Sequence, residues 1–302
     1  MNIAVSLFSS AFYEGLAYGL VALGVYLTFR VLSFPDLTVD GSFPLGGAIV
    51  AILIVGGVNP WLASLAALGA GLAAGLCTSL LNTKLRINAL LAGILMMVAL
   101  YSINLVVMGR ANVSLLREIT VFDQVSRWIG VQNSVAVSIV FMVVGIAVIL
   151  ALLDWFLHTE MGLALRATGE NQQMVRGLGA NTDLTTILGV SLSNGLVALS
   201  GALISQNQGF ADAGMGIGMI VMGLASVIIG EGIFRPRSVT AILLAVIGGT
   251  FVYRLFLGLA LRLGLPPVDF KLVTAALVVV ALAIPYARKK IRREWIPPAV
   301  RM

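Results

Sequence analysis

Charged and metal-binding residues are scarce in this sequence. Only 11% of its 302 residues are Asp, Glu, Lys or Arg, and it contains one cysteine and one histidine. The lone Cys77 cannot form a disulfide within the chain, and Cys and His nowhere show the spacing of a metal site. The phosphate-binding pattern G-x-x-x-x-G-K-[ST] is also missing. These absences argue against a disulfide-stabilised secreted domain, and against a metal, a cofactor or ATP bound on this chain.

Apolar residues are abundant instead, at 59% of the chain, and the mean hydropathy is +1.03. A membrane-spanning helix needs about 20 mostly apolar residues. The apolar runs are continuous rather than alternating, which favours helices over barrel strands. The sequence therefore predicts an all-α fold, a polytopic transmembrane helical bundle of about 8–9 spans, in a single domain covering residues 1–302. The candidate spans are 9–29, 44–56, 60–81, 88–108, 134–157, 184–206, 216–230, 238–256 and 269–287.

Two of these spans, 44–56 and 216–230, are too short to cross a bilayer regularly. We therefore expect one or two broken or re-entrant helices. Between the fourth and fifth spans, the segment 109–133 contains REITVFDQVSRWIG, which predicts a short surface helix.

The basic residues predict the orientation of the chain. Lys and Arg collect on the cytoplasmic side of membrane proteins, which places the basic tail 288–302 inside and the N-terminus outside. The net charge of +6 then needs no nucleic-acid partner. Of the 19 Lys and Arg residues, this orientation leaves outside only Arg110, Arg117, Arg127, Arg254, Arg262 and Lys271.

Residues 158–183 form a polar segment between two spans and are the most informative stretch. Thr168 or Gly169 could begin a short helix with Glu170 in its first turn, where a negative charge suits the helix dipole. Such a helix would project Arg166, Glu170, Asn171 and Arg176 into the cytoplasm. An interfacial helix lying on lipid headgroups is the alternative. Because residues 159–183 contain no aromatic side chain, a surface for a protein partner is the better interpretation.

Several polar residues lie at the depth of the membrane. The segment 32–47, LSFPDLTVDGSFPLGG, has two prolines and Asp40, and either lines a translocation path as a broken helix or is a plain cytoplasmic loop. Asn104, Ser193 and Asn194 lie within spans and are further candidates for the path. Hydrogen bonding between helices is the competing role for each of them.

Four blocks of the sequence resemble one family, and one of them is GLCTSLLNTKLRINALLAGILMM at residues 75–97. Residues 161–203, MGLALRATGENQQMVRGLGANTDLTTILGVSLSNGLVALSGAL, carry its pattern of Arg-Ala-x-Gly-x-Asn followed by an Arg and a Gly-rich turn. The opening GLAYGLVALGVYLTFRVLSFPDLTVDGSFPLGGA and the later GLASVIIGEGIFRP match further blocks. The chain resembles the branched-chain amino acid and ribose permeases of ABC importers, and is similar to a subgroup associated with tryptophan or tyrosine binding proteins.

This resemblance implies the partners and the cargo. The chain would be a permease subunit in a bacterial inner membrane, moving a small solute, an amino acid of branched-chain or aromatic type, from an extracytoplasmic substrate-binding protein. A cytoplasmic ABC ATPase dimer, carrying ATP and Mg²⁺, would dock on a coupling helix at about 166–178. Arg166, Gly169, Glu170, Asn171 and Arg176 would form the contact. A second permease subunit, as a homodimer, would complete the path.

Other functions compete with this one. The same importer class with a sugar or nucleoside cargo is one alternative. An ion-gradient-driven secondary transporter is another, although such proteins need ionisable groups inside the bundle, and Glu14, Asp154, Glu231 and Asp269 all lie at predicted span ends. An intramembrane enzyme is disfavoured, because the sole His158 sits at the end of a span.

Overall fold

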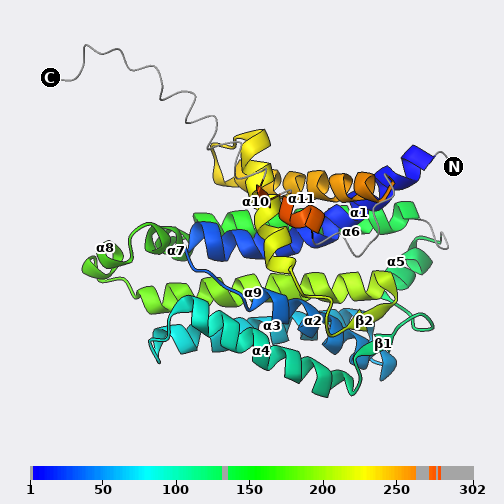
Figure 1. The fold of residues 1–302 in the computed structure, drawn as a ribbon, viewed down its shortest axis with the longest axis horizontal. Helices are drawn as coiled ribbons and strands as arrows, with labels where there is room; N and C mark the ends of the chain where they lie inside the picture. The colour runs from blue at the N-terminus through cyan, green and yellow to red at the C-terminus, as the bar shows by residue number, and fades with distance from the viewer. Residues whose placement is uncertain (1–2, 131–134, 263–271, 277, 280–302) are drawn as a thin grey trace, which may run out of the picture.

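The computed structural model describes residues 3–130, 135–262, 272–276 and 278–279. Its long helices run lengthwise side by side (Figure 1). The helices are α1 (Ile3–Val25), α2 (Val39–Val55), α3 (Pro60–Thr83), α4 (Ala89–Met108), α5 (Val121–Ile129), α6 (Val135–His158), α7 (Glu160–Glu170), α8 (Gln172–Gly177), α9 (Thr182–Gln208), α10 (Met219–Phe234) and α11 (Val239–Arg262). A π-helix, η1 (Tyr26–Val31), continues α1.

The helical lengths confirm a polytopic membrane protein. Within the described residues, six helices are long and apolar enough to cross a bilayer, and α2 and α10 are shorter apolar helices. These two occupy the positions of the two spans predicted to be short. The span predicted at 269–287 lies mostly outside the described residues, so a total of nine stays a prediction. Two boundaries were wrong, because α1 begins at Ile3 and α11 continues to Arg262.

Helix α1 with η1 forms the centre of the bundle. In the apolar window of this span 83% of the residues are buried, against 22% in α4 and 17% in α6, which therefore present most of their side chains outward.

Close packing of α3 on α9 depends on glycine. A Cβ at Gly71 would meet the carbonyl of Asn194, and one at Gly75 would meet the carbonyl of Val190.

The chain between η1 and α2 is irregular and buried. Pro35 lies in this irregular stretch. The next residue, Asp36, is fully buried, and its carboxylate accepts a hydrogen bond from the backbone N–H of Thr38. Because proline disfavours a helical conformation in the residue before it, the first helix does not continue through Phe34, and α2 starts at Val39. The segment 32–47 is therefore a broken helix rather than a plain loop.

Side chains of α9 connect this irregular segment to the rest of the bundle. The amide of Asn194 donates to the carboxylate of Asp36 at 2.7 Å, and its carbonyl accepts from the hydroxyl of Ser42 at 2.7 Å. The hydroxyls of Thr38 and Thr78 share a hydrogen bond at 2.8 Å. All of these side chains are buried, so each polar group is satisfied inside the protein.

The start of α10 is held by a carboxylate from α2. Asp40 accepts hydrogen bonds from the backbone N–H groups of Gly218 at 2.9 Å and Ile220 at 2.8 Å. The first N–H groups of a helix have no partner within it, and in a membrane protein water cannot supply one. Asp40 therefore links the N-termini of the two short helices.

A small cap that the all-α prediction missed lies at the end of the bundle opposite α8. The antiparallel strands β1 (Asn112–Ser114) and β2 (Phe210–Asp212) pair there (Figure 1). Next to them, α5 begins at Thr120 with a capping box formed with Asp123. The short helix predicted within 109–133 is thus confirmed.

We predict that Asn194→Leu destabilises the protein. The change leaves the buried oxygens of Asp36 and Ser42 without their partner, which costs about 1–3 kcal/mol for each unsatisfied group, and more for a charged one. Thermal unfolding of the purified protein in detergent measures the effect. Asn207→Leu, at an exposed position of the same helix, is the matched control. Equal melting temperatures of the two variants would show that this network does not stabilise the bundle.

Candidate functional site

The polar segment 158–183 folds into two short helices at one end of the bundle (Figure 1). Helix α7 begins after Thr159, whose hydroxyl accepts from the N–H of Gly162 at 3.3 Å. Helix α8 begins after Asn171, whose side chain accepts from the N–H of Met174 at 3.0 Å. The predicted helix start at Thr168 or Gly169 was wrong. Asn171 is the better cap, and its extended backbone, with φ −154°, ends α7.

Glu170 is consequently the last residue of α7 and not in the first turn of a helix. It is exposed, as are the four residues that follow it. In the six-residue α8 the only buried side chain is Val175. An interfacial helix would need a continuous apolar face for lipid, whereas the exposed large apolar side chains are only Met174 in α8 and, directly after its end, Leu178. The exposed surface of 170–174 is the part of this segment that a soluble partner can reach.

Gly169 faces the bundle and not the solvent. A Cβ at this position would overlap the carbonyl oxygen of Val31 in η1. The absence of a side chain thus allows the end of α7 to pack directly against the backbone of the first span. Gly169 therefore fixes the position of the α7–α8 segment. It would support the predicted contact surface without touching the partner itself.

Arg176 and Thr168 also bind within the chain. The Arg176 guanidinium donates to the hydroxyl of Thr182 at 2.6 Å and to the carboxylate of Asp183 at 3.0 Å. The hydroxyls of Thr168 and Thr185 lie 3.0 Å apart. These contacts join α7 and α8 to the first turn of α9. Arg166 is half-buried, whereas Glu170, Asn171 and Arg176 are exposed.

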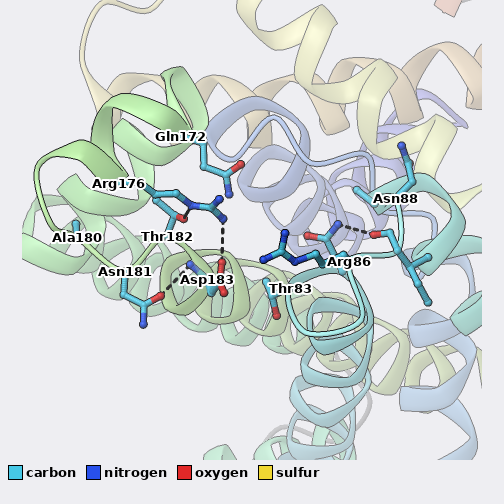
Figure 2. Close-up of a pocket in the computed structure, with 12 residues that line it drawn as sticks. Thr83, Arg86, Asn88, Gln172, Arg176, Ala180, Asn181, Thr182 and Asp183 are labelled. Carbon is cyan, nitrogen blue, oxygen red and sulfur yellow. Dashed lines mark hydrogen bonds and ion pairs between the residues drawn. The ribbon is translucent and has the colours of Figure 1, made fainter.

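A cleft of about 590 Å³ lies between α8, the start of α9 and the turn from α3 to α4. Figure 2 shows Arg176 reaching toward Asp183 on one side, with Arg86 on the other. The turn itself is held by Asn82, whose amide donates to the carbonyl of Ile87 at 2.8 Å. The lining residues are Asn82, Thr83, Arg86, Ile87, Asn88, Ala89, Gln172, Arg176, Ala180, Asn181, Thr182 and Asp183. Polar groups dominate, so the cleft suits a polar segment of a partner protein.

The predicted path residues lie together in the interior. The hydroxyl of Ser193 donates to the carbonyl of Gly24 at 2.7 Å, and the amide of Asn104 donates to the carbonyl of Gly41 at 3.2 Å. Asn194 and Asp40 make the contacts described above. All four bond between elements of this chain, which is the competing role that the sequence left open. Their place in a translocation path stays a prediction.

Sequence reasoning passed over Asp36. This residue is in the segment 32–47, but only Asp40 of that segment was predicted to line the path. Its position directly after a proline in an apolar context was the available signal, because a carboxylate there must find partners inside the protein.

Helices long enough to span a bilayer, two short helices meeting inside the bundle, and an exposed polar surface at one end define a multi-pass membrane transport subunit. Comparison with known families agrees with this class. The profile described as "Branched-chain amino acid transport system / permease component" matches residues 7–282. The chain belongs to this family, which is one of ABC transporter permease subunits.

Individual relatives differ in the cargo that their names state. The tyrosine transport system permease protein of Clostridioides difficile (strain R20291) is 39% identical over 291 residues, which cover 95% of each chain. The galactofuranose transporter permease protein YtfT of Escherichia coli (strain K12) is 28% identical, over 88% of this chain and 75% of the relative. The ribose import permease protein RbsC of the same strain is 28% identical, over 70% and 64%. No solved structure gave a significant match.

We predict that Gly169→Ala destabilises the protein and displaces α7. The new methyl group would overlap the Val31 carbonyl, and overpacking of this kind costs about 1–3 kcal/mol. Gly177→Ala is the control, since a Cβ there meets nothing within 4 Å and alanine favours a helix. Melting temperatures of both variants in detergent test the contact. A Gly169→Ala variant as stable as Gly177→Ala would contradict it.

Proposed function

We propose that this chain is the membrane-spanning subunit of an ATP-driven importer that moves an amino acid, branched-chain or aromatic, received from an extracytoplasmic binding protein. Membership of the permease family supports the transport class. Near-complete coverage at 39% identity with a permease named for tyrosine supports an amino acid over a sugar, because the relatives named for ribose and galactofuranose are 28% identical.

Energy for transport would come from a partner. The surface at residues 170–174 and the adjoining cleft would receive a cytoplasmic ATPase dimer, which binds ATP and Mg²⁺. ATP binding can move the permease only if the ATPase contact differs between two states of the permease. A firmly attached α7–α8 segment suits this task, since the hydrogen bonds to α9 and the contact of Gly169 with η1 carry a displacement into the bundle.

The orientation of the chain and its assembly with a second copy follow from the ATPase contact. The α8 end faces the cytoplasm of a bacterial cell, the N-terminus lies outside and the C-terminus inside. Residues 1–302 act as one permease unit, and a second copy of the chain completes the path. Within the bundle, Asp40, Asn104, Ser193 and Asn194 lie closest to the broken helices, where transporters commonly bind their solutes.

An ion-gradient-driven transporter is the alternative, and the ionised side chains near the spans favour the importer. Glu231 at the end of α10 accepts a charge-assisted hydrogen bond from Arg30 at 2.9 Å, and Asp154 accepts from the hydroxyl of Thr240 at 2.8 Å. Glu231, which already has Arg30 as its cationic partner, is therefore poorly suited to bind and release a coupling ion.

Uptake into proteoliposomes tests the proposal. The permease is reconstituted with its ATPase and binding protein, and labelled tyrosine, leucine and ribose are supplied in turn. We expect uptake of an amino acid that needs hydrolysable ATP and continues when ionophores collapse all ion gradients. Uptake driven by a gradient without ATP would contradict the importer, and ATP-driven uptake of ribose alone would contradict the cargo.

We further predict that Glu170→Lys abolishes uptake while membrane insertion and the melting temperature stay unchanged. The reversal alters the exposed charge next to α8 without touching a buried contact. Co-purification of the ATPase should fall in parallel with uptake. Glu160→Lys, at the opposite end of α7 and also exposed, is the matched control and should retain both. Normal ATPase binding and uptake in Glu170→Lys would refute the docking surface.

A further inference from the structure

An ion pair lies within the membrane-spanning helices, far from the α8 end. The guanidinium of Arg254 in α11 donates to the carboxylate of Glu14 in α1, with 2.8 Å between Nη1 and Oε2. Eleven residues of α1 precede Glu14, about 16 Å of helix, and eight residues of α11 follow Arg254, about 12 Å. Glu14 lies near the start of the apolar stretch Phe12–Val31, as the sequence placed it, and Arg254 lies inside the stretch Val239–Ala260.

The pair leaves polar groups without partners. Arg254 has its Nε atom buried with no hydrogen-bond partner among the described residues, and the same holds for the hydroxyl of Tyr13 on α1. The side chain of Glu14 is 46% exposed, whereas that of Arg254 is 17% exposed. An ionised carboxylate exposed to lipid would be very costly, so charged groups in spans face a water-filled cavity or another subunit. The exposed side of Glu14 therefore faces water or another subunit rather than lipid.

Aromatic rings surround these charges. The guanidinium of Arg254 lies over the ring of Tyr18, 3.6 Å from its centroid. The Tyr18 ring stacks on Phe43 of α2, and Phe12 contacts Phe251 edge to face with 5.6 Å between ring centres. An apolar aromatic environment strengthens ionic contacts made beside it, because the local dielectric constant is low.

We propose that Glu14 and Arg254 form a binding site for the zwitterionic head group of an amino acid. The solute's ammonium group binds the carboxylate of Glu14, its carboxylate binds the guanidinium of Arg254, and its side chain lies against the aromatic rings of α1 and α11. This site rests on the proposed amino acid cargo and adds the residues that recognise it.

The zwitterion fits because it carries both charges. Because the side chain of Arg254 is mostly buried, separating it from Glu14 without a replacement would leave its charge unpaired. A zwitterion inserted between Glu14 and Arg254 supplies a new partner to each. A neutral sugar can replace neither partner, so the site would discriminate against it.

Transport assays with the complete complex test the proposal. With the binding protein saturated with tyrosine, we expect Glu14→Gln and Arg254→Lys to lower the uptake rate about tenfold or more, while ATP hydrolysis and subunit assembly stay at wild-type levels. The charge-swapped Glu14→Arg/Arg254→Glu variant should stay equally impaired, because its charges no longer match the position of the rings. Restoration of uptake by the swap, or parallel loss of assembly and uptake, would show a purely structural ion pair and overturn the site.

A direct measurement of ligand binding tests the Glu14–Arg254 site independently of the proposed transport function. Saturation-transfer NMR on the permease in lipid nanodiscs is recorded with tyrosine, with tyramine, which lacks the carboxylate, and with 3-(4-hydroxyphenyl)propionate, which lacks the ammonium group. Wild-type protein should favour tyrosine over both. Glu14→Gln should lose the preference over the propionate alone. Equal signals from all three compounds would refute the site even if ATP-driven amino acid uptake is observed, whereas ATP-driven uptake of ribose alone would refute the cargo.

Discussion

Interrupted backbone inside a membrane protein must find its hydrogen-bond partners within the chain, and this constraint shapes the bundle. Helices α2 and α10 both begin in its interior, where water cannot satisfy their first N–H groups. Asp40 binds the start of α10, while Asp36 and Asn194 fix the irregular segment before α2. Two carboxylates and one amide thereby hold three distant parts of the chain together. Sites of this kind, with polar groups concentrated where helices break, are where transporters handle their solutes.

The same helices connect this interior to the α8 end. Helix α9 carries Asn194 in its middle and, in its first turns, the partners of α7 and α8, namely Thr182, Asp183 and Thr185. On the other side, the close contact of Gly169 with η1 reaches the central helix of the bundle. A force applied at α8 therefore acts on α1 and α9 together. The structure supplies a physical connection between the surface proposed for the ATPase and the polar interior.

The local features of the fold could be predicted from the sequence, and the long-range ones could not. Apolar length alone indicates the spans, and the prolines near Asp36 and Asp40 indicate a broken helix. The family pattern around Arg166–Asn171 identifies the transport class. By contrast, the partner of Asp40 is 178 residues away, and the pairing of β1 with β2 joins Asn112 to Asp212, 100 residues apart. The predicted helix start at Thr168 or Gly169 was wrong. The hydroxyl of Thr168 bonds to Thr185 of α9, and Asn171 caps the start of α8. The ion pair of Glu14 was missed because its partner Arg254 lies on a helix far along the chain.

Accessibility of α8 in intact cells tests the central claim most directly. A cysteine replaces the exposed Gln173 in a Cys77→Ser background, and a membrane-impermeant thiol reagent is added to intact cells, to reach the outer side, and to inside-out membrane vesicles, to reach the cytoplasmic side. The account predicts labelling only from the cytoplasmic side, protection when the ATPase is present, and a cross-link from this cysteine to the ATPase. Labelling from outside the cell, or equal labelling with and without the ATPase, would contradict it.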